Sequence, residues 1–380
     1  MDRIPVKFGE NPRFSDAKIR LMRDDDRLKV RSIVRRAFSP IEQYFFAWTP
    51  HVLVVEGDGQ LVGTIVLKVF ALPHNRKGGA IAWIATIPEV RGWGLGQSLV
   101  EAGLDFLDNQ GCDEILASVE GFNTSSSKLF ATRGFTILSP SAQFRRYGLA
   151  TFAVWAQISH YSEHGYFLWA RPAPVGSDSP ILQWWGTIAM NAAIGFLMLW
   201  RLDDPEMMKP MIWLVLPLIL IILFGLRYLG MGLAARRQRL NMRFRAWDSA
   251  FPIAIAIALI FGGVYPIPGS VYPTRNQWRY RDWLPALGWV ALAGTLPVLL
   301  LIWGVWILSR LDLVSSYLIT WLDVTLLLGK PLILFDIAMP FFPFICFNGR
   351  RLWDWNKIVW GLMAGAAIVV CLFARIPPIR

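Results

Sequence analysis

The residues from Arg91 to Gly96 read Arg-Gly-Trp-Gly-Leu-Gly and have the composition of an anion-binding turn. An apolar segment ends before them at Pro88, and apolar side chains recur at helical spacing after them, over residues 97–107. Glycines let the main chain approach a bound group closely, and the first amides of a helix point toward negative charge. We therefore predict a pyrophosphate-binding site formed by Ile87, Arg91, Gly92, Trp93, Gly94, Leu95, Gly96, Gln97 and Ser98.

The spacing of this loop separates the kinds of phosphate-binding motif. A Walker loop requires a lysine after its last glycine, but Gln97 follows Gly96. A dinucleotide fingerprint requires Gly-x-Gly-x-x-Gly and an acidic residue about 20 residues later, and the sequence lacks that spacing. An Arg-x-x-Gly-x-Gly pattern after a strand instead resembles the acetyl-CoA loop of the GNAT N-acetyltransferases, with Arg91, Gly94 and Gly96 at the motif positions.

A second segment, residues 123–135, carries the same resemblance. It begins with Asn123, continues with a short predicted helix and ends in Gly134-Phe135. The GNAT family ends its domain with the same order of Asn, a short helix and Gly-Phe. The resemblance covers about residues 15–172 and implies an α/β fold in which helices flank a mixed central sheet. It also implies acetyl-CoA as co-substrate and an amine acceptor, with Asn123 and Phe130 at the pantetheine or thioester end.

The catalytic groups are less well defined than the binding loop. Phe130 stands where the family commonly has a tyrosine that protonates the departing thiolate, and a phenyl ring has no proton to donate. The nearest carboxylates are Glu120 and Glu89, which we name as the catalytic candidates; the alternative is that each is a solvated or loop-positioning residue. Many enzymes of this family act by positioning the amine and the thioester, which orientation effects permit.

Hydrophobic periodicity predicts the elements that hold the loop in place. A hairpin signal, Gly57-Asp58-Gly59, separates two apolar runs of period two. We predict strands at Lys18–Met22, Val52–Glu56, Leu61–Val69 and Ile115–Glu120, a helix at Asp24–Phe38, and final strands at Phe144–Trp155 and Tyr166–Ala170.

Composition divides the chain near residue 180. The chain is 54% hydrophobic and contains 19 tryptophans, which is unusual for a soluble protein of 380 residues. Because about 20 apolar residues cross a bilayer, we predict about six or seven membrane spans. The apolar runs are Ile181–Trp200, Met211–Leu226, Phe251–Val264, Leu284–Leu308, a broken run over Leu313–Phe347, and Ile358–Phe373. The predicted organisation is a GNAT-like acyl-CoA-binding domain (1–172), a linker (173–180) and an all-α polytopic transmembrane domain (181–380).

Charge predicts the orientation in the membrane. The acidic connection at residues 201–209 suits the outer side, whereas the arginines of residues 236–245 are a positive-inside signal. Residues 1–20 are polar, so we expect no secretory signal peptide. With acetyl-CoA a cytosolic metabolite, these features predict an integral protein of the cell membrane whose first domain is cytoplasmic. The net charge of +11 lies mostly in the second half, which favours membrane lipids over nucleic acid as partner.

Three segments of the second half resemble the membrane-embedded site-2 proteases. In the first, Arg227 and Met231 take the positions of the two zinc-binding histidines, and Tyr228 takes that of the glutamate. Residues 291–297 resemble the family's Ala-Gly-Pro segment, and residues 343–349 resemble its Pro-Phe segment, with Asn348 in place of the aspartate. The resemblance implies a degenerate scaffold, a pseudoprotease without metal that could still bind a transmembrane peptide or protein.

The remaining metal and charge candidates leave alternatives open. His160-Tyr161-Ser162-Glu163-His164 matches an inverted zinc-protease pattern, but its strand-like surroundings favour a polar loop. Ionisable residues within the apolar runs are costly in lipid, so they either form a ligand site or else pair with one another or snorkel near helix ends; they are Arg227, Asp323, Lys330 and Asp336. Three cysteines predict no disulfide framework.

These observations together predict a membrane-anchored N-acetyltransferase that transfers an acetyl group from acetyl-CoA to an amine, on a protein or a small molecule. The leading alternative is an acyl-CoA-sensing regulatory domain on a catalytically dead protease-like scaffold. An active membrane peptidase is the third hypothesis, which the missing zinc ligands disfavour.

Overall fold

A computed structural model describes residues 4–5, 17–57, 59–158, 164–173, 179–202, 210–274, 279–310 and 316–374. The chain forms two compact units. The first contains Met1–Val119, Leu129–His160 and Phe167–Gly176. The second contains Ser177–Arg380 and also two short segments from the first half of the sequence, Glu120–Lys128 and Tyr161–Tyr166.

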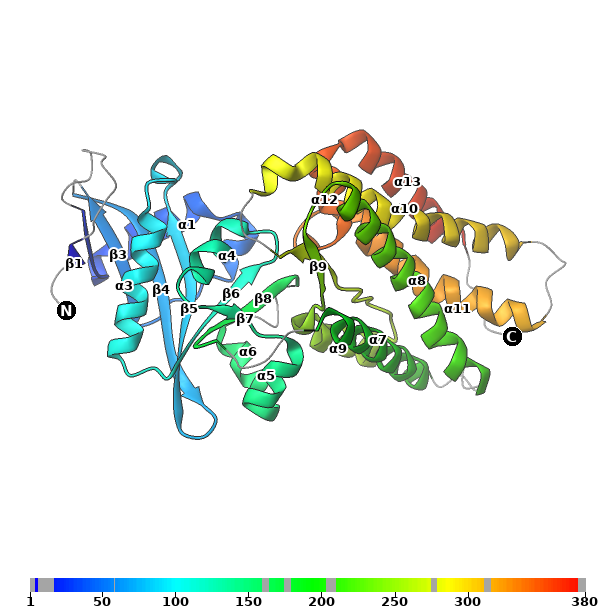
Figure 1. The fold of residues 1–380 in the computed structure, drawn as a ribbon, viewed down its shortest axis with the longest axis horizontal. Coiled ribbons are helices and arrows are strands. Elements are labelled where there is room, and N and C mark those ends of the chain that lie inside the picture. Colours follow the sequence, from blue (N-terminus) through cyan, green and yellow to red (C-terminus); the bar gives the residue numbers. More distant parts are fainter. Residues whose placement is uncertain are drawn as a thin grey trace. The chain divides into compact units, whose positions relative to one another are not determined.

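A mixed sheet, eight-stranded over the described residues, organises the first half of the chain, in the order β1-β2-β3-β4-β5-β6-β8-β7 (Figure 1). Neighbours from β1 to β5 run antiparallel, whereas β5 and β6 run parallel and β7 and β8 antiparallel. The strands are β1 (Ile4–Pro5), β2 (Lys18–Leu21), β3 (His51–Gly57), β4 (Gln60–Leu72), β5 (Arg76–Thr86), β6 (Glu114–Glu120), β7 (Thr136–Ile137) and β8 (Tyr166–Arg171).

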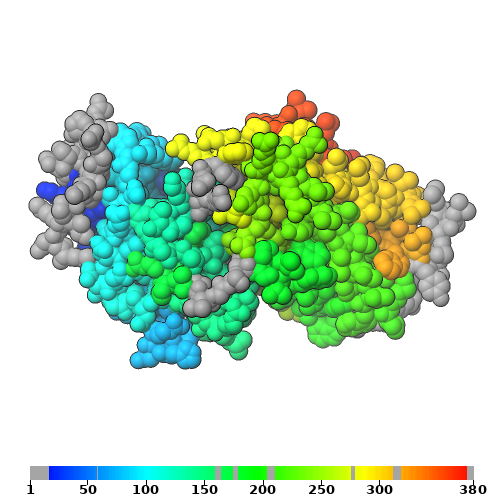
Figure 2. Space-filling view, viewed as in Figure 1, coloured from blue at the N-terminus to red at the C-terminus, as the bar shows by residue number. Residues whose placement is uncertain are grey.

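Alternation along the strands places helices on both faces of this sheet. Gly103 of α3 (Leu95–Asn109) leaves room for Ile65 and Leu67 of β4, so α3 packs closely on one face. Val66 points to the opposite face, where it packs with Val30 and Val34 of α1 (Arg27–Ala37). The other helices of this half are α2 (Pro40–Tyr44), α4 (Thr124–Ala131), α5 (Pro140–Tyr147) and α6 (Thr151–Ile158). The turn between β4 and β5 stands out from the surface in Figure 2.

Most predicted elements of this half are confirmed. The predicted strands at residues 18–22, 52–56, 61–69, 115–120 and 166–170 correspond to β2, β3, β4, β6 and β8. The predicted helix at 24–38 corresponds to a 3-10 turn (Asp24–Asp26) followed by α1. Asp58 of the hairpin signal lies outside the described residues, and Gly59 after it has a φ of 72°.

The prediction of a strand at Phe144–Trp155 is wrong. The segment is helical, forming α5 and α6, and the short strand β7 instead pairs with β8. Ser139 starts α5 because its Oγ accepts a hydrogen bond from the amide of Ala142 at 3.3 Å, and Pro140 occupies the first helical position. Trp155 of α6 then donates to the Gln143 side chain at 2.6 Å, so the aromatic residues pack between helices.

Helices and one short hairpin make up the second half of the chain. The helices are α7 (Pro180–Leu202), α8 (Pro210–Arg237), α9 (Phe251–Phe261), α10 (Leu284–Leu308), α11 (Ser316–Ile333), a π-helical segment (Leu334–Ala338), α12 (Asn348–Trp355) and α13 (Lys357–Phe373). The hairpin pairs β9 (Met242–Arg245) with β10 (Ser270–Pro273). Residues 203–209 and Leu313, which the sequence assigns to a connection and to the start of a span, lie outside the described residues.

Four of the described helical stretches are long and apolar enough to cross a membrane: Pro180–Leu202, Pro210–Arg237, Tyr280–Leu308 and Leu318–Ala338. Two predicted spans correspond to shorter apolar helices, Asp248–Phe261 and Lys357–Phe373. The first of these ends where Gly262 adopts a φ of 61°. The 11 residues of α9 extend about 17 Å, which is less than the bilayer core of about 30 Å.

Close contacts between small residues bring α8 and α10 together. A side chain on Gly230 would meet the carbonyl oxygen of Ala293 at 1.9 Å, and one on Gly294 would meet Met231 at 2.5 Å. Glycine is therefore required at this crossing. The contact joins two of the three segments that resemble the site-2 proteases.

Candidate functional sites

The predicted pyrophosphate loop forms the corner between β5 and α3. Gly92 and Gly94 have φ angles of 88° and 81°, a left-handed conformation that favours glycine. Apart from the glycine itself, its chain neighbours and the backbone of its own helix, no atom of the described residues lies within 4 Å of the position that a Cβ would occupy on Gly92, Gly94 or Gly96. The glycine side of the loop therefore faces open space.

The first turn of α3 supplies main-chain donors at this corner. The amides of Gln97 and Ser98 donate to the carbonyl of Gly94 at 2.9 and 3.1 Å. The amides of Leu95 and Gly96 precede these bonds and, as first-turn groups, have no intrahelical acceptor. Since α3 is 15 residues long, its dipole adds partial positive charge at the same place. The corner can thus bind an anion through its main chain.

The side chains of the loop divide into exposed and buried groups. Arg91 is exposed and makes one long contact of 3.5 Å, to the carbonyl of Ala37. Gln97 is exposed, and Ile87, Trp93 and Ser98 are half-buried. Leu95 is only 2% exposed, so its side chain belongs to the core and is not available to a ligand. These positions agree with a ligand that is bound mainly by the backbone and by the charge of Arg91.

The two strands behind the loop separate as they approach it. The parallel ladder joins Gly78–Ile81 of β5 to Glu114–Ala117 of β6, and within the described residues it does not continue beyond them. A register shift between β4 and β5 at Val66/Leu67 falls at the same level. Residues Trp83–Thr86 of β5 pair with Gly63–Val66 of β4, and over the described residues they are not part of the ladder with β6. Their edge away from β4 can accept the hydrogen bonds of an extended ligand.

The segment at residues 123–135 has a mainly structural role in the fold. The Asn123 side chain caps α4, since its Oδ1 accepts from the amide of Ser126 at 3.1 Å. Phe130 is 3% exposed and packs edge-to-face on Phe135, with ring centroids 5.1 Å apart. The Phe130 ring is therefore a core side chain.

The two carboxylate candidates lie in different surroundings. Glu89 is exposed and forms an ion pair with Arg36, which ties the start of the loop to α1. Glu120 is the half-buried last residue of β6, and its Oε2 accepts from the amide of Phe122 at 2.8 Å. Burial raises the pKa of Glu120 to about 7, while the Phe122 amide and the charge of Arg351 oppose that rise. Glu120 can therefore exchange a proton near neutral pH, as a general base does.

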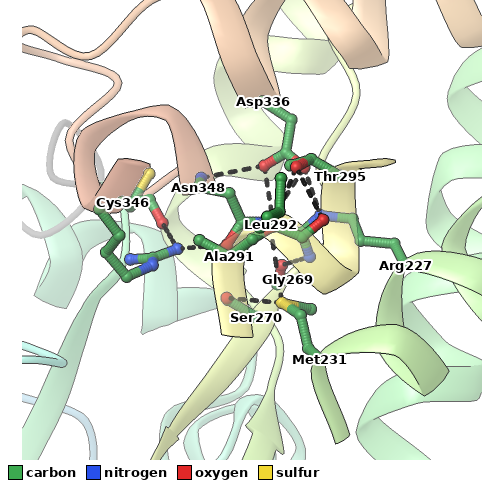
Figure 3. A network of polar contacts seen from close by, with 11 residues as sticks. Arg227, Met231, Gly269, Ser270, Ala291, Leu292, Thr295, Asp336, Cys346 and Asn348 are labelled. Carbon is green, nitrogen blue, oxygen red and sulfur yellow. Dashed lines mark hydrogen bonds and ion pairs between the residues drawn. The ribbon is translucent and has the colours of Figure 1, made fainter. Parts of the chain in front are cut away.

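A second polar centre lies inside the second unit, where the three protease-like segments meet (Figure 3). Arg227 is 1% exposed and forms a bidentate ion pair with Asp336, at 2.8 and 2.9 Å. Its third donor reaches the carbonyl of Gly269 at 2.7 Å. Asn348 donates to the same carboxylate through its amide, at 3.1 Å, and through Nδ2, at 3.0 Å. We call these residues, with Met231, the Arg227–Asp336 centre.

Met231 completes this centre on the opposite side. Its Sδ lies 3.7 Å from Asn348 Nδ2 and 3.9 Å from Ser270 Oγ. Arg227, Met231 and Asn348 thus converge in space, as expected if they replace three metal ligands. Tyr228 does not join them and packs against Phe244, with ring centroids 5.4 Å apart.

Of the two alternatives for the charged residues in the apolar runs, mutual pairing is confirmed for Arg227 and Asp336. Lys330 instead donates to the carbonyl of Ala374. Asp323 is 2% exposed, and its Oδ2 has no hydrogen-bond partner among the described residues. No group of three His, Cys, Asp or Glu residues in the described part of the chain is placed to hold a metal ion.

Of the inverted zinc-protease pattern, residues 160–163 lie outside the described residues. His164 is buried, and its Nδ1 lies 3.0 Å from the hydroxyl of Tyr265.

Two residues near the candidate base are absent from our sequence predictions. Arg351 places its guanidinium 4.5 Å from the centre of the Phe122 ring, and Phe122 supplies the amide that binds Glu120. The helical spacing from Asn348 to Arg351 is a signal that could have indicated a shared face with the protease-like segment. For Phe122 we find no such signal.

Comparison with known proteins identifies a domain in the first half. Residues 20–135 match the model of the Acetyltransferase (GNAT) family. A mycothiol acetyltransferase of Thermobispora bispora is 35% identical over 95 residues, which are 24% of this chain and 32% of that protein. One of Acidimicrobium ferrooxidans is 38% identical over 85 residues, 22% of this chain and 27% of that protein. The chain thus spans about a third of the length of these relatives.

Another protein with a similar sequence is named as a protease and not as an acetyltransferase. MJ0611 of Methanocaldococcus jannaschii, named as a candidate zinc metalloprotease, is 28% identical over 131 residues, 34% of this chain and 63% of that protein. Among solved structures, the NatC complex bound to Gag peptide and CoA has a TM-score of 0.32 at 19% identity, covering 42% of this chain and 99% of that one. N-acetylglutamate synthase from Neisseria gonorrhoeae has a TM-score of 0.31 at 21% identity, covering 41% and 34%. The chain contains a GNAT-family domain followed by a helical domain that resembles a protease without its zinc ligands.

Proposed function

We propose that this protein is a membrane-anchored N-acetyltransferase that transfers an acetyl group from acetyl-CoA to an amine. The observation that carries the proposal is the corner at residues 91–98, where left-handed glycines border open space at the first turn of α3 and Arg91 is exposed. The diphosphate of coenzyme A has the charge and size that such a corner binds. The edge of β5 at Trp83–Thr86 would receive the pantetheine arm.

The reaction needs an amine in its neutral form. The amine nitrogen attacks the thioester carbon, the C–N bond forms, and the C–S bond breaks to release coenzyme A as a thiolate. Glu120 would accept the proton that the amine loses, directly or through water. Phe130 has no proton to donate, so water would protonate the thiolate. In this scheme Glu89 has no catalytic role and positions the loop through Arg36.

The helical domain would anchor the enzyme in the cell membrane, with the acetyltransferase domain in the cytoplasm, where acetyl-CoA is available. Four long apolar helices support the anchoring, and the arginines at residues 236–245 support the orientation. Its partners would be lipids and an amine on a protein or a small molecule. The protein would not act as a zinc peptidase, because Arg227 and Met231 replace ligands that zinc requires.

The test is coenzyme A release by the full-length protein in detergent. Acetyl-CoA is supplied with a panel of peptides with free amino termini, lysine peptides and small amines, and free thiol is followed over time. We expect release that depends on one class of amine and rises as the pH passes about 7, since Glu120 must be ionised. Glu120→Gln should lower the rate at neutral pH by about 100-fold or more. Glu101→Gln, at an exposed glutamate of α3 outside the proposed site, is the matched control and should leave the rate nearly unchanged.

One observation favours a second function. Phe130 in place of a proton donor fits a domain that binds acyl-CoA without turning it over, and the protein would then regulate its own helical scaffold. Binding of acetyl-CoA without thiol release from any amine would support this alternative. Neither binding nor release would contradict both. Stoichiometric zinc in the purified protein would contradict the assignment of the helical domain.

A further inference from the structure

The segment that carries Glu120 belongs to the second unit, where aromatic and cationic side chains surround it. Phe122 is 6% exposed, and its ring centroid lies 4.8 Å from that of Tyr272 and 6.1 Å from that of Tyr280. The amide of Gly121 donates to the carbonyl of Gly165 at 3.1 Å. These contacts fix the main chain directly after Glu120.

The guanidinium of Arg351 lies over the Phe122 ring. Its guanidinium carbon lies 4.5 Å from the ring centre, within the range of a cation–π interaction. Arg351 is 3% exposed and donates to the carbonyl of Cys346 at 3.0 Å and to Asn348 Oδ1 at 2.9 Å. A buried guanidinium with these fixed partners has little freedom to move.

Asn348 connects Arg351 to the Arg227–Asp336 centre. The Asn348 side chain accepts from Arg351 through Oδ1 and donates to Asp336 through Nδ2. A continuous series of contacts therefore runs from Arg227 through Asp336, Asn348 and Arg351 to Phe122, whose amide binds Glu120. Every member lies in the second unit.

We propose that Arg351 is a positioning residue for the acetyl transfer: it holds the segment that carries Glu120 and supplies the positive charge that faces this carboxylate. The inference rests on the proposed function and adds to it a dependence of the candidate base on the protease-like centre. Asn348 and Asp336 fix Arg351 and so contribute to the position of Glu120 indirectly.

Three titratable groups act on Glu120 or feel its charge: Arg351, Tyr272 and Cys346. Burial raises the pKa of Tyr272 and of Cys346, so both are neutral at physiological pH. Arg351 is therefore the charged member of the set, and its charge lowers the pKa of Glu120 against the effect of burial.

The experiment is the pH profile of thiol release by the full-length protein and its Arg351→Gln variant. Loss of the charge should move the midpoint from about 7 to about 8, an upward shift of about one unit. The rate at pH 7 should fall about fivefold and recover at pH 9. Arg351→Lys keeps the charge and should keep the midpoint within about half a unit of the wild-type value. Arg350→Gln, at the neighbouring exposed arginine that pairs with Asp354, is the matched control and should shift nothing.

A double variant separates positioning from general damage. Because Glu120→Gln removes the titrating group, adding Arg351→Gln to it should cause no further change in the profile. If Arg351→Gln does not fold, Phe122→Leu replaces it and should shift the midpoint upward by a smaller amount. A lower rate at every pH with an unchanged midpoint would overturn the proposal. Absence of thiol release from the wild type would instead overturn the proposed function.

Discussion

The two polar sites of this chain contrast in how their groups are satisfied. At the corner of residues 91–98, Arg91 is exposed, and the space beside Gly92, Gly94 and Gly96 is open in the described structure. In the Arg227–Asp336 centre the guanidinium and the carboxylate are buried, and each is hydrogen-bonded within the protein. We call the first the open site, because its groups are available to an external anion. We call the second the closed site, because its charged groups bind one another and other groups of the protein.

This difference indicates how a ligand site can become a structural one. A metal ion holds together several side chains from different segments. Without the metal, the buried polar groups around its site need other hydrogen-bond partners. Here one guanidinium makes three of the required bonds to the surrounding segments. A bidentate ion pair thus connects α8 to the π-helical segment at Asp336 without an external ion.

The largest effect is expected from a substitution that breaks the Arg227–Asp336 ion pair of the closed site. Asp336→Asn leaves the Arg227 charge buried without its counter-ion, which should lower the free energy of unfolding by about 3 to 5 kcal/mol. Denaturant unfolding of the full-length protein in detergent measures the change. Glu89→Gln removes the partner of Arg36, at a pair whose two side chains are both exposed, and should cost at most about 1 kcal/mol. Equal losses for the two variants would show that the buried pair has no special role.

A smaller effect is expected at the open site. Gly94→Val places a branched side chain at a φ of 81°, where its Cβ projects into the space that the diphosphate would fill. Acetyl-CoA affinity should fall about 100-fold, equivalent to about 2.7 kcal/mol, as several charge-assisted hydrogen bonds are lost. Titration calorimetry measures it. The control is Gly111→Val, at a φ of 73° and also in open space but at the far end of α3, which should strain the fold similarly and leave affinity unchanged.

The smallest effect concerns the charge beside the open site. Arg91→Gln removes one ionic contact and should weaken acetyl-CoA binding about tenfold at low salt. Because exposed charges are screened, the difference should shrink at about 1 M salt, where the Debye length is about 3 Å. Arg145→Gln makes the same change of net charge on α5 and serves as the control. A salt-independent loss would argue that Arg91 acts by packing instead.

The open site could be predicted from the sequence because its parts are contiguous. Glycines, an arginine and a helix start within ten residues define a local geometry, and the structure confirms the strand, the glycine turn and the helix that follows it. The prediction at Phe144–Trp155 was wrong because aromatic residues are typical of strands. The signals for a helix lie at Ser139-Pro140, where α5 begins, and at Gly148, where it ends. Phe130 occupies a motif position, but its burial depends on Phe135 and could not be read from the pattern.

The closed site could be predicted only in part. Positions 227, 231 and 348 followed from two of the three protease-like segments, and pairing among the buried charges was one of the alternatives. That Asp336 is the partner of Arg227 depends on a contact across 109 residues of sequence, which no local spacing encodes. The contact of Arg351 with Phe122, which follows β6, was missed for the same reason, although the spacing of Arg351 from Asn348 is local.

The most direct measurement is an experimental structure of the full-length protein with coenzyme A. The account predicts diphosphate oxygens within about 3.2 Å of the amides of residues 94–96, with Arg91 alongside. Coenzyme A bound elsewhere, or a corner closed by the protein's own side chains so that the diphosphate cannot enter, would contradict it.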